Sequence, residues 1–444
     1  MKNIKKKIGN FNNIKEEKDF YRWFAYILGV SAFILSFFHR VNSTTLVPDL
    51  IKTFNVSSSS LGLLSSLYFY SYAVMQPVIG VLTDWWKPKK IFIVFLIIEG
   101  IGTFLYACSS VFLIVLLGRI LIGIGCAGIF IPLSWIIRMY FPVDKRGFLF
   151  SIQTFFANIG SILAASPLAF LIHIFGWRIA LGFFGVLAFF IALLFGLFVK
   201  DKKKDKGGID LEDEILVTDE SILEIPREKR GKGWIYTLKE VFKIPIIKYV
   251  LLSFLAYGSM ISLQGLWVIP FLLDTYKMDR LAASKIVSMV AFGAMIGVLS
   301  FSKITDSKYG KYFLFCLNVG STLVYLFFTV FTHQLYLSGL YLLFFLIGVF
   351  HGMAPFLYKI YSVILPKKIY GAALGIVNIF PLLIGALYQS ITGYMFDYFN
   401  HSDNISNLLG YKYFFLFLAI SLMIASLCSY NIIKLLNRNF KGKI

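Results

Sequence analysis

Apolar residues form long, continuous segments from residue 23 to residue 435 of the chain. A stretch of about 20 apolar residues is enough for an α-helix to cross about 30 Å of hydrocarbon. The runs do not alternate every second residue, so helices are predicted rather than the strands of a membrane barrel. The pattern predicts twelve spans, near residues 22–50, 60–83, 90–108, 111–138, 147–172, 177–199, 246–273, 281–302, 312–331, 335–361, 370–394 and 412–435.

The two halves of the chain repeat each other at a distance of 222 positions. Without any gap, Pro48, Leu50, Thr53, Thr83, Asp84 and Lys89 recur as Pro270, Leu272, Thr275, Thr305, Asp306 and Lys311. A duplicated membrane domain whose halves keep the same orientation has this appearance. We therefore predict an all-α membrane protein with two pseudo-symmetric six-helix bundles, residues 1–199 and 246–444, joined by a cytoplasmic linker at 200–245. Its functional site is expected in a cavity between the bundles.

Composition and charge support this interpretation and fix an orientation. Only 15% of the residues are charged, whereas a soluble domain has about 25%. Lysine and arginine gather at both termini and in the even-numbered loops, so both termini are predicted to face the cytoplasm, in a bacterial inner membrane. The net charge of +20 is spread over short loops. It therefore reflects topology, and binding of nucleic acid is not expected.

Several classes of function find no support in the sequence. The five histidines are scattered, the four cysteines lie in or beside spans, and no metal-ligand spacing occurs. A glycine-rich phosphate loop is missing, so direct use of ATP is not expected. The N-terminus lacks a small-residue cleavage site, so the first span is expected to stay as an anchor. We predict no enzyme activity, no cofactor and no metal, and expect the duplicated chain to act as a monomer.

Three motifs resemble one family. They are Gly80-Val-Leu-Thr-Asp84-Trp-Trp-Lys87-Pro-Lys89-Lys90 after span 2, Thr305-Asp306 to Lys311 after span 8, and Leu117-Gly118-Arg119 to Gly128 in span 4. Together with the twelve spans and the internal repeat, they resemble the major facilitator superfamily of membrane transporters. The sequence of span 1 is similar to that of the family's bacterial organophosphate antiporters. The sequence of span 2 is similar to that of members near the lysosomal dipeptide carriers.

The resemblance implies a role in gating for the charged turns. In the family, these turns clasp the two halves when the outer gate is open. The corresponding residues here are Gly80, Asp84, Lys89, Lys90, Asp306 and Lys311. Gly80 is expected to allow close approach of another backbone. Ser302 replaces the expected glycine in the second copy, which is therefore weaker. The alternative is that these residues only set the topology.

Ionisable residues inside a membrane are costly and often functional. Arg40, Glu99 and Arg119 are the conspicuous examples. Because spans 3 and 4 turn near Ser109, Glu99 and Arg119 are expected at the same depth, where they could pair. Such a pair is either structural or part of coupling to protons. The resemblance favours a coupling role for Arg119, and Glu99 is the obvious carboxylate for a proton.

Arg40 is our candidate for contact with the substrate, since span 1 lines the cavity in the resembled fold. A guanidinium binds carboxylate or phosphate through two parallel hydrogen bonds. The related antiporters have a second arginine in span 7, which is absent from Gly258 to Trp267 here. A monocarboxylate, amino acid or short peptide is therefore favoured over a phosphate dianion. A snorkelling role at the membrane interface is the alternative for Arg40.

Other polar side chains at membrane depth are candidates for contact with the substrate. They are His39, Asn42, Tyr68, Tyr72, Gln76, Gln153, Asn158, Gln264, Trp267, His351 and Asn378. Many such groups only hold helices together, and His351 is also a candidate protonation switch.

The sequence thus predicts a secondary carrier that moves a small, carboxylate-bearing solute by alternating access. Its predicted partners are that solute, the lipid bilayer and, if transport is coupled, protons. The alternatives are an antiporter of organophosphate and inorganic phosphate, or a facilitative uniporter.

Overall fold

A computed structural model describes residues 2–199, 239, 241–305, 310–352, 360, 370–400 and 406–439. Within these residues, the regular secondary structure is helical. The first half contains α1 (Lys2–Phe54), α2 (Ser58–Trp85), α3 (Pro88–Cys108), α4 (Phe112–Tyr140), α5 (Val143–Leu163) and α6 (Ser166–Phe198). The second contains α8 (Ile247–Ser253), α9 (Leu255–Ser262), η3 (Leu263–Trp267), α10 (Val268–Tyr276), α11 (Arg280–Thr305), α12 (Gly310–Val330), α13 (Leu337–Phe350), α15 (Tyr370–Asn400) and α16 (Ser406–Asn439).

These helices account for all twelve predicted spans. Nine stretches of the described residues are long and apolar enough to cross a membrane, and one of them, Phe148–Phe198, covers two spans. That stretch turns back at Gly176, whose φ of 77° suits glycine. The remaining two predicted spans, the second and the tenth, correspond to α2 and to the 14-residue α13. Residues 353–359 and 361 of the tenth predicted span, and most of the predicted linker, lie outside the described residues.

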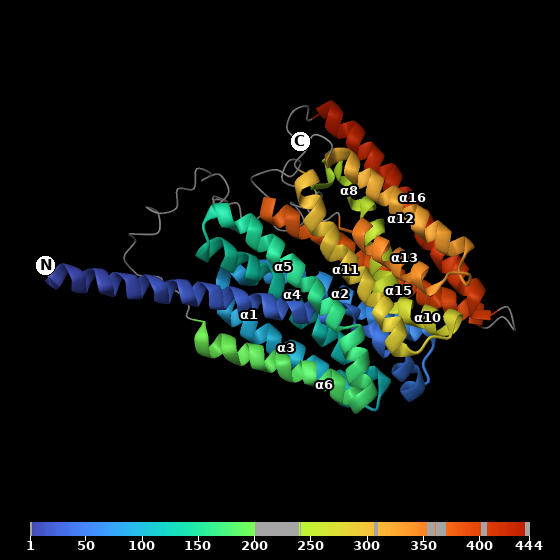
Figure 1. Ribbon diagram of the computed structural model, residues 1–444, viewed down its shortest axis with the longest axis horizontal. Coiled ribbons are helices and arrows are strands. Elements are labelled where there is room, and N and C mark those ends of the chain that lie inside the picture. The colour runs from blue at the N-terminus through green and yellow to red at the C-terminus, as the bar shows by residue number, and fades with distance from the viewer. Residues whose placement is uncertain are drawn as a thin grey trace.

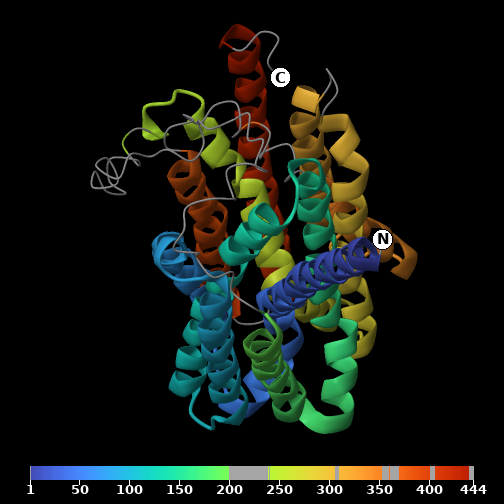
Figure 2. The same cartoon turned by 90° about the vertical axis from the view of Figure 1, so that its left-hand side faces the viewer.

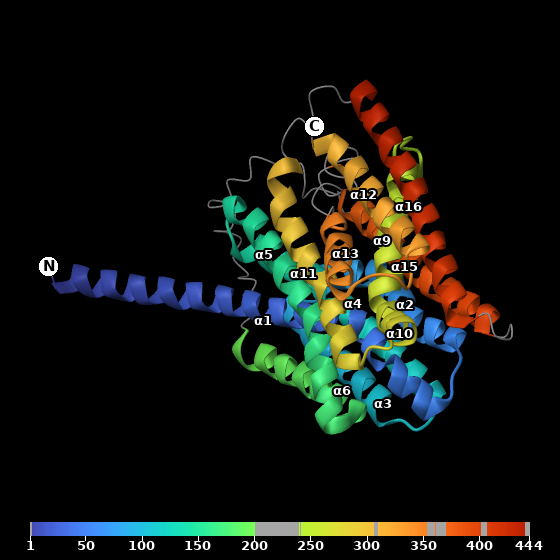
Figure 3. The same cartoon turned by 45° about the vertical axis from the view of Figure 1, so that its right-hand side comes forward.

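The helices form two groups that lie side by side. In Figure 1 the first half, blue to green, packs along the second half, yellow to red. Figure 3 shows α5 beside α11, and α2 beside α15, at the seam between them. The first part of α1 projects beyond the other helices, as Figures 1 and 3 show, and in Figure 2 it comes toward the viewer. The prediction of an integral, multi-pass, all-α protein with two six-helix bundles is thereby confirmed. The exact boundaries at 199 and 246 stay a prediction.

Two spans are broken near the seam. The fifth is interrupted between α5 and α6, where Pro167 cannot supply a helical N–H. The Ala164 carbonyl at this break accepts a 2.7 Å bond from the Thr45 hydroxyl of α1. The seventh span is divided into α8, α9, η3 and α10. Irregular backbone at membrane depth needs such partners because lipid offers none.

The halves are held together at the end of the bundle where α1 connects to α2. Asp397 of α15 accepts bonds from the backbone N–H groups of Ser58 and Ser59, at 2.7 and 3.0 Å. The carboxylate thus caps the N-terminus of α2 from the opposite half, where the helix dipole favours an anion. Arg280 and Asp49 form a 2.8 Å ion pair beside it.

Small residues let α2 and α15 approach closely below this cap. A Cβ added to Gly62 would lie 2.5 Å from the Gln389 carbonyl oxygen. One turn further along, the Ser390 hydroxyl donates to the Ser66 hydroxyl over 3.1 Å. The α1–α2 end of the seam is therefore tightly closed in this structure.

The closed seam predicts a reversible cross-link. Ser66→Cys with Ser390→Cys, in a background without the four native cysteines, should form a disulfide on mild oxidation, because the two side chains already touch. A thiol-specific polymer label read on a gel measures the cross-link. If the seam must open during function, oxidation should stop solute movement and a reductant should restore it. Leu63→Cys with Ser390→Cys is the control, since Leu63 is exposed. Full cross-linking without loss of function would contradict the prediction.

Candidate functional site: the cavity between the two halves

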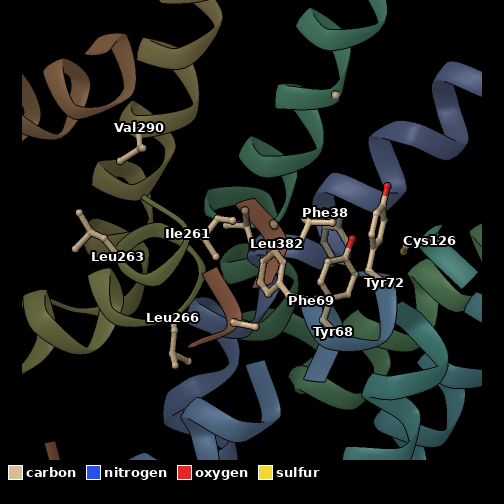
Figure 4. Close-up of a cluster of buried hydrophobic side chains, with 14 of the residues drawn as sticks. Phe38, Tyr68, Phe69, Tyr72, Cys126, Ile261, Leu263, Leu266, Val290 and Leu382 are labelled. Atoms are coloured by element: carbon tan, nitrogen blue, oxygen red, sulfur yellow. The ribbon is translucent and has the colours of Figure 1, made fainter. Parts of the chain in front are cut away.

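A cavity lies at membrane depth between the two halves. It is formed by α1, α2 and α5 on one side and by α9 and η3 on the other. The space that a water-sized molecule can occupy there is about 20 Å³, so the two walls lie close together in this structure. The polar lining residues are Arg40, Asn158, Ser161, Tyr257 and Gln264, and the apolar ones are Phe37, Val41, Phe69, Met260, Ile261 and Gly265. In Figure 4, Phe69 points toward Ile261 of the second half.

Arg40 lines this cavity and bridges the two halves. Its Nη1 donates a 2.9 Å bond to the hydroxyl of Tyr257 on α9. Its guanidinium also lies 4.3 Å from the ring centroid of Phe37, within the range of a cation–π contact. The Nε atom is buried without a hydrogen-bond partner. Arg40 therefore has unused donor capacity in the cavity, as a site for an anion requires.

The broken seventh span supplies the opposite wall. η3 is a π-helical turn, a feature that is rare and often found at functional sites. It places Gln264 and Gly265 against the cavity. The break is tied to the first half, since the Ile269 N–H after η3 donates to the Thr44 hydroxyl over 3.3 Å.

Four predicted residues form a buried network inside the first half instead of lining the cavity. His39, Asn42, Glu99 and Arg119 are all fully buried. Arg119 Nη1 donates to Asn42 Oδ1 over 3.1 Å, and Asn42 Nδ2 lies 3.3 Å from His39 Nδ1. His39 Nε2 faces Glu99 Oε1 at 3.5 Å.

This arrangement corrects the expected pairing of Glu99 with Arg119. Both side chains are described, and no ion pair forms between them; His39 and Asn42 of α1 lie between the two groups. The sequence argument fixed only their depth along α3 and α4. It could not show that a third helix separates them.

The other predicted residues of the first half have mixed positions. Asn158 lines the cavity, with Nδ2 bonded to the Thr154 carbonyl of its own helix. The Tyr72 ring lies 6.0 Å from the Arg40 guanidinium. Tyr68 is buried and donates to the Ser36 carbonyl, at 3.0 Å. Gln76 and Gln153 are also buried, and each keeps one side-chain atom without a partner.

In the second half, Gln264 is the predicted residue that reaches the cavity wall. Trp267 donates to the Thr392 hydroxyl over 2.7 Å and packs on Phe396, so it joins η3 to α15. His351 lies between the carbonyls of Ile347 and Ala256, which makes it a packing contact between α13 and α9. Asn378 is half-buried on α15.

The predicted gating residues lie at the opposite end of the bundle, around the α2–α3 connection. Lys89 donates a 2.8 Å bond to the Gly196 carbonyl near the end of α6, and Lys90 lies 4.1 Å from the Trp86 ring. Gly80 makes no close approach, because a Cβ there would meet nothing within 4 Å. This differs from the expectation of a close backbone approach at Gly80. Asp306 and the side chains of Asp84 and Lys311 lie outside the described residues.

The sequence argument missed Tyr257, the partner of Arg40. It searched the seventh span for a second cation and found none, but it did not consider a hydroxyl. The available signal was the position of Tyr257 directly before Gly258, in a span already suspected to line the cavity.

Comparison with known proteins agrees with this architecture. The family model described as Major Facilitator Superfamily matches residues 28–388. A bacterial homologue of the human lysosomal transporter Spinster, solved in an inward-facing and unoccupied conformation, superposes with a TM-score of 0.70 and 18% identity, covering 94% of this chain and 98% of that one.

Curated relatives align with part of the chain. The uncharacterized transporter YybO of Bacillus subtilis is 27% identical and aligns over 59% of this chain and 60% of its own length. The probable sulfoacetate transporter SauU of Cupriavidus necator is 32% identical over 39% of this chain and 41% of its own. A probable hexose phosphate transport protein of Chlamydia trachomatis is 21% identical over 68% of each chain. The alignments with YybO and SauU thus cover less than two thirds of those proteins.

The buried network predicts a difference in stability between two asparagines. Asn42→Ala should lower the free energy of unfolding by about 1–3 kcal/mol, because it strips a buried guanidinium of its bonded partner. Asn158→Ala removes only a bond within its own helix and should cost less. Thermal unfolding of the two purified variants measures the difference. Equal melting temperatures would show that the network does not stabilise the first half.

Proposed function

The chain belongs to the Major Facilitator Superfamily, and we propose that it moves a small organic anion across a membrane by alternating access. The observation that carries this proposal is Arg40 at the seam, which lines the cavity and keeps a buried Nε without a hydrogen-bond partner. Charge-assisted bonds from a guanidinium suit a carboxylate, sulfonate or phosphate. Neutral groups of the other half, Tyr257 and Gln264, complete the polar lining.

The proposed cargo is a carboxylate-bearing monoanion. Arg40 is the cation that lines the cavity among the described residues, and the seventh span offers a hydroxyl in the region where related antiporters are expected to have an arginine. One guanidinium neutralises one negative charge. The apolar lining, including Phe37 and Met260, also suits a solute with a small apolar part.

A phosphate ester is the second candidate. It is supported by the similarity to probable hexose phosphate transport proteins, whereas the similarity to a probable sulfoacetate transporter supports an organic acid. A thermal-shift screen of the purified protein against lactate, sulfoacetate, amino acids, dipeptides and glucose 6-phosphate separates these candidates. A ligand that binds only the folded state raises its melting temperature.

We propose that this structure is closed toward the outside. The α1–α2 end is closed by Asp397, Arg280 and the packing of α2 on α15. The basic residues at the termini and in the even-numbered loops support the proposal that this end lies at the outer face of a bacterial inner membrane.

Substitution of Arg40 tests the proposal directly. Arg40→Ala should weaken apparent affinity by about 10- to 100-fold, the value of hydrogen bonds to a charged group. Arg40→Lys should also be impaired, since an ammonium cannot reproduce the planar fork. Counterflow of radiolabelled anion in proteoliposomes measures both variants, with protein content checked in each preparation.

Arg178→Lys is the matched control. Arg178 bonds the Ser109 carbonyl at the α3–α4 turn, outside the cavity, so this variant should keep wild-type counterflow. Normal counterflow by both Arg40 variants would exclude Arg40 as the anion site.

A further inference from the structure

The buried network of the first half has a fixed direction of hydrogen bonding. A guanidinium can only donate, so Arg119 Nη1 identifies the facing atom of Asn42 as the acceptor oxygen. The Asn42 amide nitrogen must then donate to His39 Nδ1. A histidine that accepts at Nδ1 is neutral and carries its proton on Nε2. That Nε2 atom lies 3.4 Å from the Thr103 hydroxyl of α3 and 3.5 Å from Glu99 Oε1, and the same hydroxyl donates to the Glu99 backbone carbonyl over 2.8 Å. The relay runs from Arg119 through Asn42 and His39 to Glu99.

Unused donors and acceptors remain at the two ends of this relay. Both carboxyl oxygens of Glu99 lack a hydrogen-bond partner, since the 3.5 Å separation from His39 is long for one. Nε and Nη2 of Arg119 are also without partners. An ionised carboxylate in this low-dielectric environment would attract both the His39 N–H and the guanidinium strongly. Their separation is the arrangement expected when Glu99 is a neutral acid.

We propose that Glu99 is a reversible proton-binding site and that the relay through His39, Asn42 and Arg119 transmits its charge state to the anion cavity. With the proton bound, the cluster holds the single charge of Arg119. When the proton leaves, the carboxylate balances that charge, draws the His39 N–H to bonding distance and pulls the relay toward α3. The consequence for cargo rests on the proposed function, whereas the proton site itself does not.

The groups that face Glu99 and the relay come from several helices. α1 contributes His39, and α4 contributes Arg119 and the buried thiol of Cys126, which faces Glu99. Tyr68 of α2 lies under the Arg119 guanidinium, 4.9 Å from it. Tyr106 of α3 faces Arg119 as well.

α6 closes the remaining side of the network with aromatic rings. Phe184 stacks on Phe38 of α1, and Phe189 packs against Gly100, the neighbour of Glu99. Asp49, which pairs with Arg280, also faces Tyr106. Within the relay of Arg119, Asn42, His39 and Glu99, the carboxyl is that of Glu99.

Two features connect the proton site to the cavity. His39 and Asn42 flank Arg40 on α1, so a shift of the relay acts on the helix that carries the anion site. Tyr68 also faces both cations, because its ring lies 4.9 Å from the Arg119 guanidinium and its hydroxyl interacts with Arg40. Transmission through such a network needs a direct measurement of coupling.

Infrared difference spectroscopy of the purified protein tests the site without any ligand. Raising the pH should remove the carbonyl band of a protonated glutamic acid in the wild type. The band should be absent from Glu99→Gln. The matched control is Asp274→Asn, which changes a carboxyl of the second half bonded to Tyr411 and should keep the band.

Labelling glutamate with ¹³C in the wild type should shift this band, which assigns it even if Glu99→Gln does not fold. A band that is absent at every pH, that does not shift with the label or that survives in Glu99→Gln would overturn the proposal.

A transport measurement tests the transmission. In vesicles loaded with a pH-sensitive dye, lactate and sulfoacetate are added with and without a pH gradient. The wild type should accumulate anion above equilibrium when a gradient is present. Glu99→Gln and His39→Asn should equilibrate anion without accumulating it, and His39→Asn should keep the infrared band. Uphill accumulation by Glu99→Gln would overturn the transmission step. Failure of the wild type to carry any anion would count against the proposed function, while the spectroscopic result would still decide the proton site.

Discussion

The cost of placing charge inside a membrane organises this molecule. An ionic or strongly polar group at that depth must bind a partner, face a water-filled space or lose its charge. The first half meets this requirement in two ways. Arg119, Asn42, His39 and Glu99 contact one another inside the bundle, although polar atoms at both ends keep no partner. Arg40 lies at the seam instead, beside a cavity and a hydroxyl of the other half. His39 and Arg40 are neighbours on α1, yet His39 faces the interior of the first half and Arg40 faces the cavity, because successive residues of a helix point in different directions.

The same cost explains where the helices break. A helix can be interrupted at membrane depth only where protein groups take up the freed backbone bonds. Thr45 does this for the break between α5 and α6, and Thr44 does it beside η3. Both threonines follow Arg40 on α1, so one helix carries the proposed anion site and fixes both broken spans. The irregular segments at the cavity are thus anchored next to Arg40.

The sequence predicted the features that depend on hydrophobicity and repetition. The resemblance, in which span 1 lines the cavity, also indicated the position of Arg40 at the seam, whereas its contact with the substrate stays a prediction. Predictions that needed the rotation of one helix against another were less secure. Glu99 and Arg119 do lie in the same cluster, but residues of α1 separate them. Tyr257 was missed because an uncharged partner for Arg40 has no marked sequence signal in a span rich in aromatic residues.

The two halves of the chain share the order of their helices but differ in the charged side chains that they place at the cavity. The 222-residue repeat retains the turns and the helix order, yet the charged groups at the described cavity and in the buried network belong to the first half. The second half faces the cavity with Tyr257 and Gln264. The Tyr257 hydroxyl accepts a hydrogen bond from Arg40, and its own proton can be donated to another group. An anion at the seam can therefore take a bond from each half at once, so that the bound cargo joins the two bundles that must move around it.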